Sequence, residues 1–338
     1  MLLPVAVIAA GLLWQAYCMW LAVKYSEVEL PDVFGNRPHN IEAAAREKPD
    51  DSNSGLRFAV ITDTHGSGTV HALMAELKKH EPEFIFLVGD VANDAEPGDH
   101  QHLQVQMVET SMNCPVFYIV GNHDIGEPYG IEEWEETYGP CQFFFKRAGN
   151  LFIALNIWEH CRAESGVRFL EETLRNESAG MKRIFVLNHV PPDVGYGWQA
   201  HALPEQERLL ALLQEYNVTY FISGDYHGYS QVRCGCTAFV VSGGGGGKLR
   251  GGALGFHHAV IFTVHDEAVQ TRLCVVPPSS STLDYLRYSA FTRFIPFARK
   301  NMFLVIVIDI VCIAVLVLFA HRSTRLRRRP VRPAAQPI

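Results

Sequence analysis

Short apolar runs that end abruptly in polar residues recur along the central part of the chain. Nine of these runs have the composition of strands, and they cover residues 58–62, 84–88, 116–120, 151–157, 184–187, 220–223, 238–241, 259–264 and 270–276. Helical spacing of apolar residues appears in residues 70–80, 99–111, 131–138, 167–175 and 205–216. Alternating strands and helices predict an α/β domain whose helices cover the sheets. The close spacing of the last strands predicts a second, partly antiparallel sheet.

Two longer apolar runs lie near the ends of the chain, at residues 2–23 and 302–320. Each run is long enough to cross a bilayer as a helix, which takes roughly 20 residues. The first could be a secretory signal, but it lacks a positively charged start, and Trp14, Tyr17 and Trp20 crowd the cleavage region. We therefore expect an uncleaved anchor. Asp309, within the second run, could be functional, pair with the first run, or stay protonated without a role.

Basic residues predict the orientation of these two spans. No acidic residue follows residue 320, and six arginines do: Arg322, Arg325, Arg327, Arg328, Arg329 and Arg332. The positive-inside rule places this tail in the cytoplasm and residues 24–300 in a lumenal, extracellular or periplasmic space. Sequons at Asn176 and Asn217 agree with that side. Four basic residues lie just before the second span: Arg287, Arg293, Arg299 and Lys300. They argue against this orientation, unless their side chains reach the membrane interface.

The remaining composition adds two constraints. The formal net charge is −7 and no basic stripe runs through the middle of the chain, which argues against nucleic-acid binding. Six cysteines lie outside the two spans: Cys114, Cys141, Cys161, Cys234, Cys236 and Cys274. Disulfides are permitted in an oxidising space, but the pairing cannot be deduced. Cys234 and Cys236 could bind a metal or be redox-active, and structural cysteines near a turn are the favoured interpretation.

Five of the predicted strands deliver Asp, Asn or His at their carboxyl ends. These side chains are Asp63 and His65, Asp90, Asn122 and His123 with Asp124, His189, and Asp225 with His227. Ligands of α/β sheets bind at this edge. Imidazole, carboxylate and amide groups without thiolate suit hard to borderline divalent cations. Seven of these nine side chains are candidate ligands, which is too many for one tetrahedral zinc ion and suits two ions, which can clamp a phosphoryl group.

The order of these motifs resembles the calcineurin-like metallophosphoesterase family over about residues 57–265. Asp-x-His, Gly-Asp, Gly-Asn-His-Asp and His occur in the family order, and VVSGGGGGKL follows the last motif. The resemblance implies a four-layer α/β/β/α sandwich with a two-metal centre, flanked here by transmembrane helices. It also implies two divalent metal ions, with Mn, Fe or Zn as the candidates.

The resemblance also implies a role for each residue. Asp63, His65 and His227 would bind the first metal, Asp90 would bridge, and Asn122 and His189 would bind the second. His123 would face the substrate, to protonate the leaving oxygen or stabilise charge, and Asp124 would orient His123.

One position departs from the family pattern. Where the family has Gly-His-x-His, this chain has Gly224-Asp225-Tyr226-His227. Asp225 could replace the histidine as a ligand of the second metal, which would favour harder ions such as Mn or Fe. Alternatively, Asp225 does not reach that metal, which is then weakly held.

These features predict hydrolysis of a phosphomonoester or phosphodiester by a membrane-anchored enzyme. The alternative is a binding or scaffold protein with a degenerate phosphoesterase fold; a transporter is disfavoured because two spans offer little pathway. The expected parts are an anchor at 1–23, a linker or loose strap at 24–56, a catalytic domain at 57–285, a juxtamembrane segment at 286–301, a transmembrane helix at 302–320 and a cytoplasmic tail at 321–338.

Overall fold

The computed structural model describes residues 2–47, 55–158, 163–196, 201, 203–250, 255–277 and 281–327. Cys161, Arg328, Arg329 and Arg332, which the sequence analysis singled out, lie outside these ranges. The chain divides into a large unit, Val28–Tyr288, and a small unit that combines the two ends of the chain, up to Glu27 and from Ser289. The two units are described separately.

Two sheets form the centre of the large unit. The first has the order β11 (Val269–Val276), β10 (His257–Val264), β1 (Leu56–Ile61), β2 (Phe84–Val88) and β3 (Val116–Ile119). The second has the order β4 (Phe143–Arg147), β5 (Asn150–Ala154), β6 (Arg183–Leu187), β7 (Tyr220–Ser223), β9 (Thr237–Ser242) and β8 (Tyr229–Cys234). Strands β1 to β3 are parallel, as are β5, β6, β7 and β9, and the other pairings are antiparallel.

The second sheet is partly antiparallel, as the spacing of the late strands suggested, but these strands are divided between the two sheets. β10 and β11 extend the first sheet, and β8 and β9 extend the second. The sequence analysis missed β4 and β8. β8 has no fully buried residue, so its sequence carries no apolar run to predict it.

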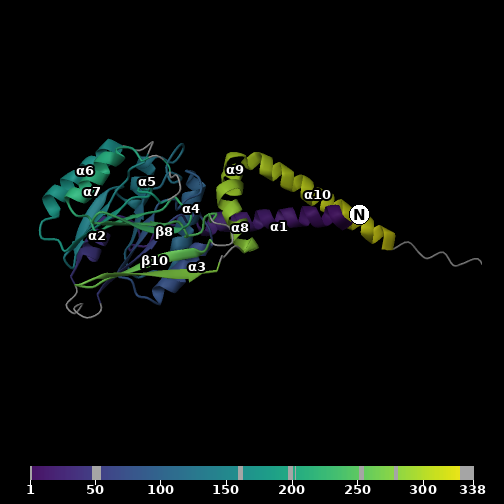
Figure 1. The fold of residues 1–338 in the computed structure, drawn as a ribbon. Helices are drawn as coiled ribbons and strands as arrows, with labels where there is room; N and C mark the ends of the chain where they lie inside the picture. Colours follow the sequence, from purple (N-terminus) through teal and green to yellow (C-terminus); the bar gives the residue numbers. More distant parts are fainter. Residues whose placement is uncertain are drawn as a thin grey trace, which may run out of the picture. The chain divides into compact units, whose positions relative to one another are not determined.

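Among its described residues, the large unit holds seven α-helices: α2 (Pro38–Ala45), α3 (Thr69–Lys78), α4 (Pro97–Thr110), α5 (Ile131–Tyr138), α6 (Ala163–Glu177), α7 (Gln206–Glu215) and α8 (Thr282–Ser289), whose last residue is assigned to the small unit. Figure 1 shows α6 and α7 on one side of this unit and α3 on the other, with the strands between them. The predicted four-layer α/β architecture is confirmed. The sequence analysis did not predict α2 or α8.

Alternate residues of the strands build the separate layers of the core. Phe84 and Phe86 of β2 pack between the sheets, where Phe152 and Phe185 of the second sheet join them. The intervening Ile85 faces the helices on the other side of the first sheet. Because both faces of these strands are buried, their sequences are continuous apolar runs.

Part of the segment expected as a linker or strap is packed on the domain. Phe34 forms an isolated bridge with Val116 of β3. The amide of Asn36 donates to the Tyr118 carbonyl at 2.6 Å and accepts from the Tyr118 N–H at 2.8 Å. Asn36 is fully buried, so this segment acts as a strap along the edge strand β3.

The Cys234-Gly-Cys236 motif forms the turn between β8 and β9. Gly235 has φ +61°, a conformation that favours glycine, and both cysteines are free thiols. The structure therefore agrees with the interpretation of these residues as cysteines at a turn.

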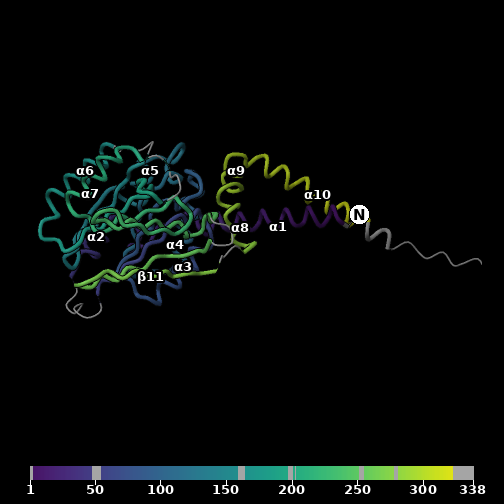
Figure 2. Tube along the Cα trace, in the orientation of Figure 1, coloured from purple at the N-terminus to yellow at the C-terminus, as the bar shows by residue number. Residues whose placement is uncertain are grey.

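The small unit contains α1 (Leu2–Lys24), the π-helix η2 (Ala290–Phe294), α9 (Ile295–Lys300) and α10 (Met302–Arg327), which can be followed in the trace of Figure 2. Leu3–Lys24 and Met302–Arg322 are long and apolar enough to cross a membrane. Within this unit, the Gln15 amide donates to the Asp309 carboxylate at 2.5 Å. Of the alternatives for Asp309, the structure shows pairing with the first apolar helix.

Candidate metal centre

The five predicted strand ends come together at one edge of the two sheets. Asp63 and Asp90 follow the adjacent parallel strands β1 and β2, and Asn122 follows β3. His189 follows β6, and the loop after the neighbouring β7 carries Asp225 and His227. Parallel strands place their carboxyl ends on the same side, so residues up to 164 positions apart in the sequence become neighbours.

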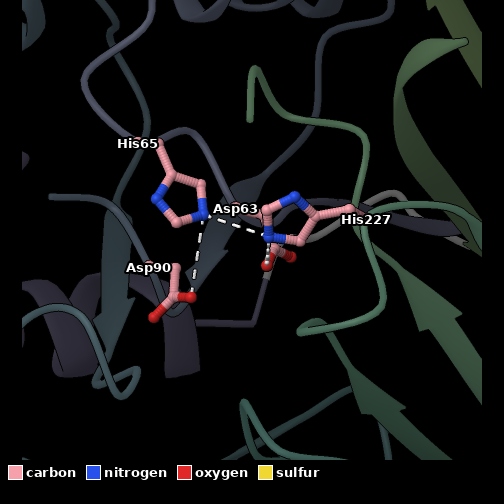
Figure 3. Close-up of side chains that lie close together, drawn as sticks. All are labelled: Asp63, His65, Asp90 and His227. Atoms are coloured by element: carbon pink, nitrogen blue, oxygen red, sulfur yellow. Dashed lines mark hydrogen bonds and ion pairs between the residues drawn. The ribbon is translucent and has the colours of Figure 1, made fainter. Parts of the chain in front are cut away.

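Four side chains form the tightest group, shown in Figure 3: Asp63, His65, Asp90 and His227. One potential ligand atom from each lies within 4.8 Å of the others. The Nε2 atoms of His65 and His227 are 3.1 Å apart, and His227 Nε2 is 3.3 Å from an oxygen of Asp63. Two carboxylates and two imidazoles that converge in this way can hold a divalent cation.

Asp90 lies between this group and a second one. Its Oδ2 is 3.7 Å from His65 Nε2, and its Oδ1 is 3.2 Å from His189 Nε2. The backbone N–H of His123 donates to Oδ1 at 2.9 Å. Asp90 is 1% exposed, and it offers one oxygen to each group, which is the arrangement of a bridging carboxylate.

The second group consists of Asp90, Asn122 and His189. Asn122 Oδ1 is buried without a hydrogen-bond partner among the described residues, and the buried His189 Nε2 faces only the Asp90 carboxylate there, at 3.2 Å. Buried polar atoms are nearly always paired, and a missing ion is one cause of an unpaired atom. The donor set of the second group therefore also fits a cation.

The histidine tautomers suit metal binding. Nδ1 of His189 contacts the Val88 carbonyl at 3.0 Å, and Nδ1 of His227 contacts the Lys248 carbonyl at 2.8 Å. A carbonyl only accepts, so both Nδ1 atoms must donate, and in the neutral form of each ring Nε2 carries the lone pair that can bind a metal. Burial lowers the pKa of His65 to about 4 and also lowers the pKa of His227, which favours the neutral, metal-binding form.

The buried carboxylates complete the electrostatic picture. Burial raises the pKa of Asp63 well above its usual range, and the charge of nearby Asp90 raises it further. Burial raises the pKa of Asp124 to about 7. Burial also raises the pKa of Asp90, but the neighbouring His189, His65 and His123 rings together lower it below its usual range. Several acidic groups in a low-dielectric interior are stabilised by a nearby cation.

Strained backbone positions several of these side chains. Positive φ angles occur at Asp63 (57°), His65 (45°), Asp90 (49°), Asp225 (65°) and His227 (56°). Such angles are uncommon for residues other than glycine and cluster at functional sites. Nothing in the residue pattern alone predicted this strain.

The hydrogen bonds of the Asp124 carboxylate go to backbone groups. Its two oxygens accept from the backbone N–H groups of Ala92 and Gly121, at 2.9 and 2.8 Å. The His123 ring instead contacts the Asn93 carbonyl through Nδ1, at 2.7 Å. The Asp124 carboxylate is fully buried and ties two site loops together, while a backbone carbonyl orients His123.

Asp225 has a partner that the sequence analysis missed. His201 Nδ1 lies 2.7 Å from Asp225 Oδ1. His201 comes from the loop between β6 and α7, so it lacks the strand-end position that identified the other residues. The Asp225 backbone N–H points to Asp63, 3.1 Å from Oδ1 and 3.2 Å from Oδ2.

The family model for calcineurin-like phosphoesterases matches residues 56–229. The chain belongs to the calcineurin-like phosphoesterase family. The match contains every candidate site residue from Asp63 to His227. Family membership makes the protein a metal-dependent phosphoester hydrolase, and its buried Asp and His cluster supports divalent metal ions as cofactors.

Other members and structures agree with this membership. A probable cyclic nucleotide phosphodiesterase of Colwellia psychrerythraea is 24% identical over 201 residues, which cover 52% of this chain and 73% of that protein. One from Synechococcus is 27% identical over 154 residues, covering 43% of this chain and 55% of that protein. The crystal structure of a dimetal phosphatase from Danio rerio matches with a TM-score of 0.53 at 10% identity, covering 67% of this chain and 100% of that one. This last likeness shows the fold.

Gly89 allows His189 to approach in this phosphoesterase site. It has φ +74°, and a Cβ there would lie 2.2 Å from His189 Nδ1. We expect Gly89→Ala to displace His189 and reduce the metal content measured by mass spectrometry. Gly180→Ala is the matched control, because Gly180 has φ +77° but no atom within 4 Å of the added Cβ. Both variants should lose about 1–2 kcal/mol of stability to backbone strain. Equal metal content in the two would contradict this explanation.

Proposed function

We propose that the protein hydrolyses a phosphomonoester or phosphodiester at a two-metal centre. The observation that carries the proposal is Asp90, which offers one oxygen to His65 and the other to His189. One ion would be held by Asp63, His65, Asp90 and His227, and the other by Asp90, Asn122, His189 and Asp225. The dimetal phosphatase and the named phosphodiesterases among the similar proteins support both ester classes.

When bound, the two divalent cations would neutralise phosphoryl charge and lower the pKa of attacking water. The protein's own groups would position the substrate and the proton. The donors are carboxylate, amide and imidazole groups without thiolate, which suit Mn, Fe or Zn. Asp225 in place of the family histidine would add a carboxylate and favour the harder ions.

His123 is the candidate for handling the leaving oxygen. Its ring lies 5.0 Å from the His65 ring, centroid to centroid, and it is exposed at the mouth of the site. Because Nδ1 donates to the Asn93 carbonyl, Nε2 remains available to the substrate. His123 would then deliver a proton to the leaving group or stabilise phosphoryl charge.

We propose that the two apolar helices anchor the enzyme, with residues 57–285 as the catalytic domain on the non-cytoplasmic side. Large apolar side chains on both helices are exposed, including Leu3 at 76% and Phe303 at 82%. Lipid is the natural cover for such surfaces. The arginines after residue 320 support a cytoplasmic tail, and exposed Asn176 and Asn217 are compatible with a lumenal domain.

His123→Ala should reduce turnover of bis-p-nitrophenyl phosphate or p-nitrophenyl phosphate by about 10²- to 10⁴-fold, because the proton donor is lost. The measurement compares kcat with Mn, Fe, Zn and Mg, alongside metal content, which should stay at the wild-type level. His39→Ala, at an exposed histidine on the strap, should keep full activity. A wild-type protein that turns over neither ester with any of the four ions would favour the binding or scaffold alternative.

Asp225→Ala should lower occupancy of the second metal position, because it removes a ligand. The measurement is the number of ions per chain by inductively coupled plasma mass spectrometry. Asp225→His restores the family residue and should retain both ions. Asp193→Ala, at an exposed carboxylate, should match the wild type. Equal occupancy of both positions in Asp225→Ala would rule out ligation.

The topology can be tested at Cys234, an exposed free thiol of the catalytic domain. A membrane-impermeant maleimide should label it in intact cells or sealed right-side-out vesicles, because the domain is expected to face away from the cytoplasm. Cys234→Ser serves as the control for labelling at other thiols. Labelling of Cys234 only in inside-out vesicles would reverse the proposed orientation.

A further inference from the structure

A small cavity adjoins the metal centre on the side of His65. Its volume is about 180 Å³. His65, Gly66 and Ser67 line one side, and Asp284, Tyr285 and Tyr288 of α8 line the other. We call this cavity the α8 pocket. Helix α8 lies beyond residues 56–229, which match the family model.

Helix α8 is held firmly against the body of the domain. The Tyr288 hydroxyl donates to Asp99 at 2.8 Å, and Asp99 is 3% exposed. Arg287 makes a bidentate pair with Glu109, at 2.6 and 2.7 Å. The wall of the pocket is therefore built from groups with defined partners.

The loop of His65 is adapted to this helix. Gly66 has φ +63°, and a Cβ there would lie 3.1 Å from the Tyr288 ring. Gln106 of α4 donates to the Gly66 and Ser67 carbonyls, at 3.3 and 3.1 Å. The floor and the wall of the pocket thus pack directly against each other.

The position of the pocket suits the leaving part of a substrate. His65, which lines it, is a candidate metal ligand, and its ring lies 5.0 Å from that of His123. A phosphoryl group on the metal centre, with its leaving oxygen near His123, would place the attached alcohol close to this cavity. This step rests on the proposed function.

The chemistry of the lining selects among alcohols. Among the described residues, neither lysine nor arginine lines the pocket, and Arg287 nearby is engaged by Glu109. Asp284 accepts from the N–H and hydroxyl of Ser281 through Oδ2, and its Oδ1 has no hydrogen-bond partner among the described residues. Tyr285 is 63% exposed and offers a ring face and a hydroxyl. Such a surface binds hydroxyl donors and repels a second negative charge.

We propose that the α8 pocket binds the alcohol portion of the substrate and selects an uncharged, hydroxyl-rich alcohol, such as glycerol or a sugar, over an acidic one. Hydrolysis breaks the P–O bond to this alcohol and adds the hydroxyl of water to phosphorus. The alcohol takes up one proton as it leaves, so atoms and charge balance.

Three phosphate esters with the same three-carbon skeleton test the selection on the full-length, metal-loaded protein. Glycerol 3-phosphate carries two hydroxyls, propyl phosphate carries none, and 3-phosphoglycerate carries a carboxylate. We expect kcat/KM for glycerol 3-phosphate to exceed that for propyl phosphate about tenfold, from one or two hydrogen bonds. It should exceed that for 3-phosphoglycerate by more. Equal kcat/KM values for all three would overturn the pocket while leaving phosphoester hydrolysis intact.

Asp284→Asn gives the discriminating variant. The amide oxygen can still accept from Ser281, but the negative charge is gone, so discrimination against 3-phosphoglycerate should fall by about fivefold. Asp266→Asn is the control, because Asp266 is exposed, pairs with Lys182 and does not line the pocket. Unchanged discrimination in Asp284→Asn would overturn the assignment of Asp284.

Binding measurements test the α8 pocket independently of catalysis. Dissociation constants of the three esters, measured by NMR on wild type and Asp284→Asn, should follow the same order even if the wild type turns none of them over. Binding in this order without any turnover would reject the proposed function and retain the pocket. Equal dissociation constants would reject the pocket. Release of glycerol from phosphatidylglycerol bicelles, compared with release from soluble glycerol 3-phosphate, distinguishes a lipid headgroup from a free ester, and either source supports the proposal.

Discussion

The carboxylate of Asp90 is the group on which the site depends. It is buried at the end of β2, it lies between His65 and His189, and it also accepts the N–H of His123. A charged carboxylate in such an interior is unfavourable unless donors or cations surround it. The surrounding groups meet this requirement: the backbone N–H of His123 donates to Asp90, and His65 and His189 direct Nε2 toward its carboxylate.

Maintaining that arrangement costs local backbone strain. Residues with positive φ are stable here because aromatic side chains are densely packed between the two sheets behind them. For example, the ring centroids of Phe58 and Phe262 are 4.7 Å apart. Gly89 removes the side chain that would collide with His189. The packed sheets therefore hold the strained loops, and with them the candidate ligands, in a geometry that the loops would not keep by themselves.

Two segments outside the residues that match the family model lie against the large unit's first sheet and metal centre. The N-terminal strap packs along β3 through Phe34 and Asn36, and α8 closes one side of the metal centre. Neither of these two segments adds a candidate metal ligand. The strap covers the edge strand β3. In our proposals, α8 contributes to binding of the alcohol, and the apolar helices set the location of the enzyme.

The sequence by itself determined the α/β class, the five strand ends and the seven candidate ligands, because buried parallel strands are continuous apolar runs and the chemistry follows each of them directly. It also indicated the apolar helices and the departure at Asp225. Only the tertiary structure decided the distribution of the late strands over two sheets, the pairing of Asp225 with His201, the backbone role of Asp124 and the wall formed by α8. Those features depend on contacts between distant segments with no local pattern, so no short stretch of residues could reveal them.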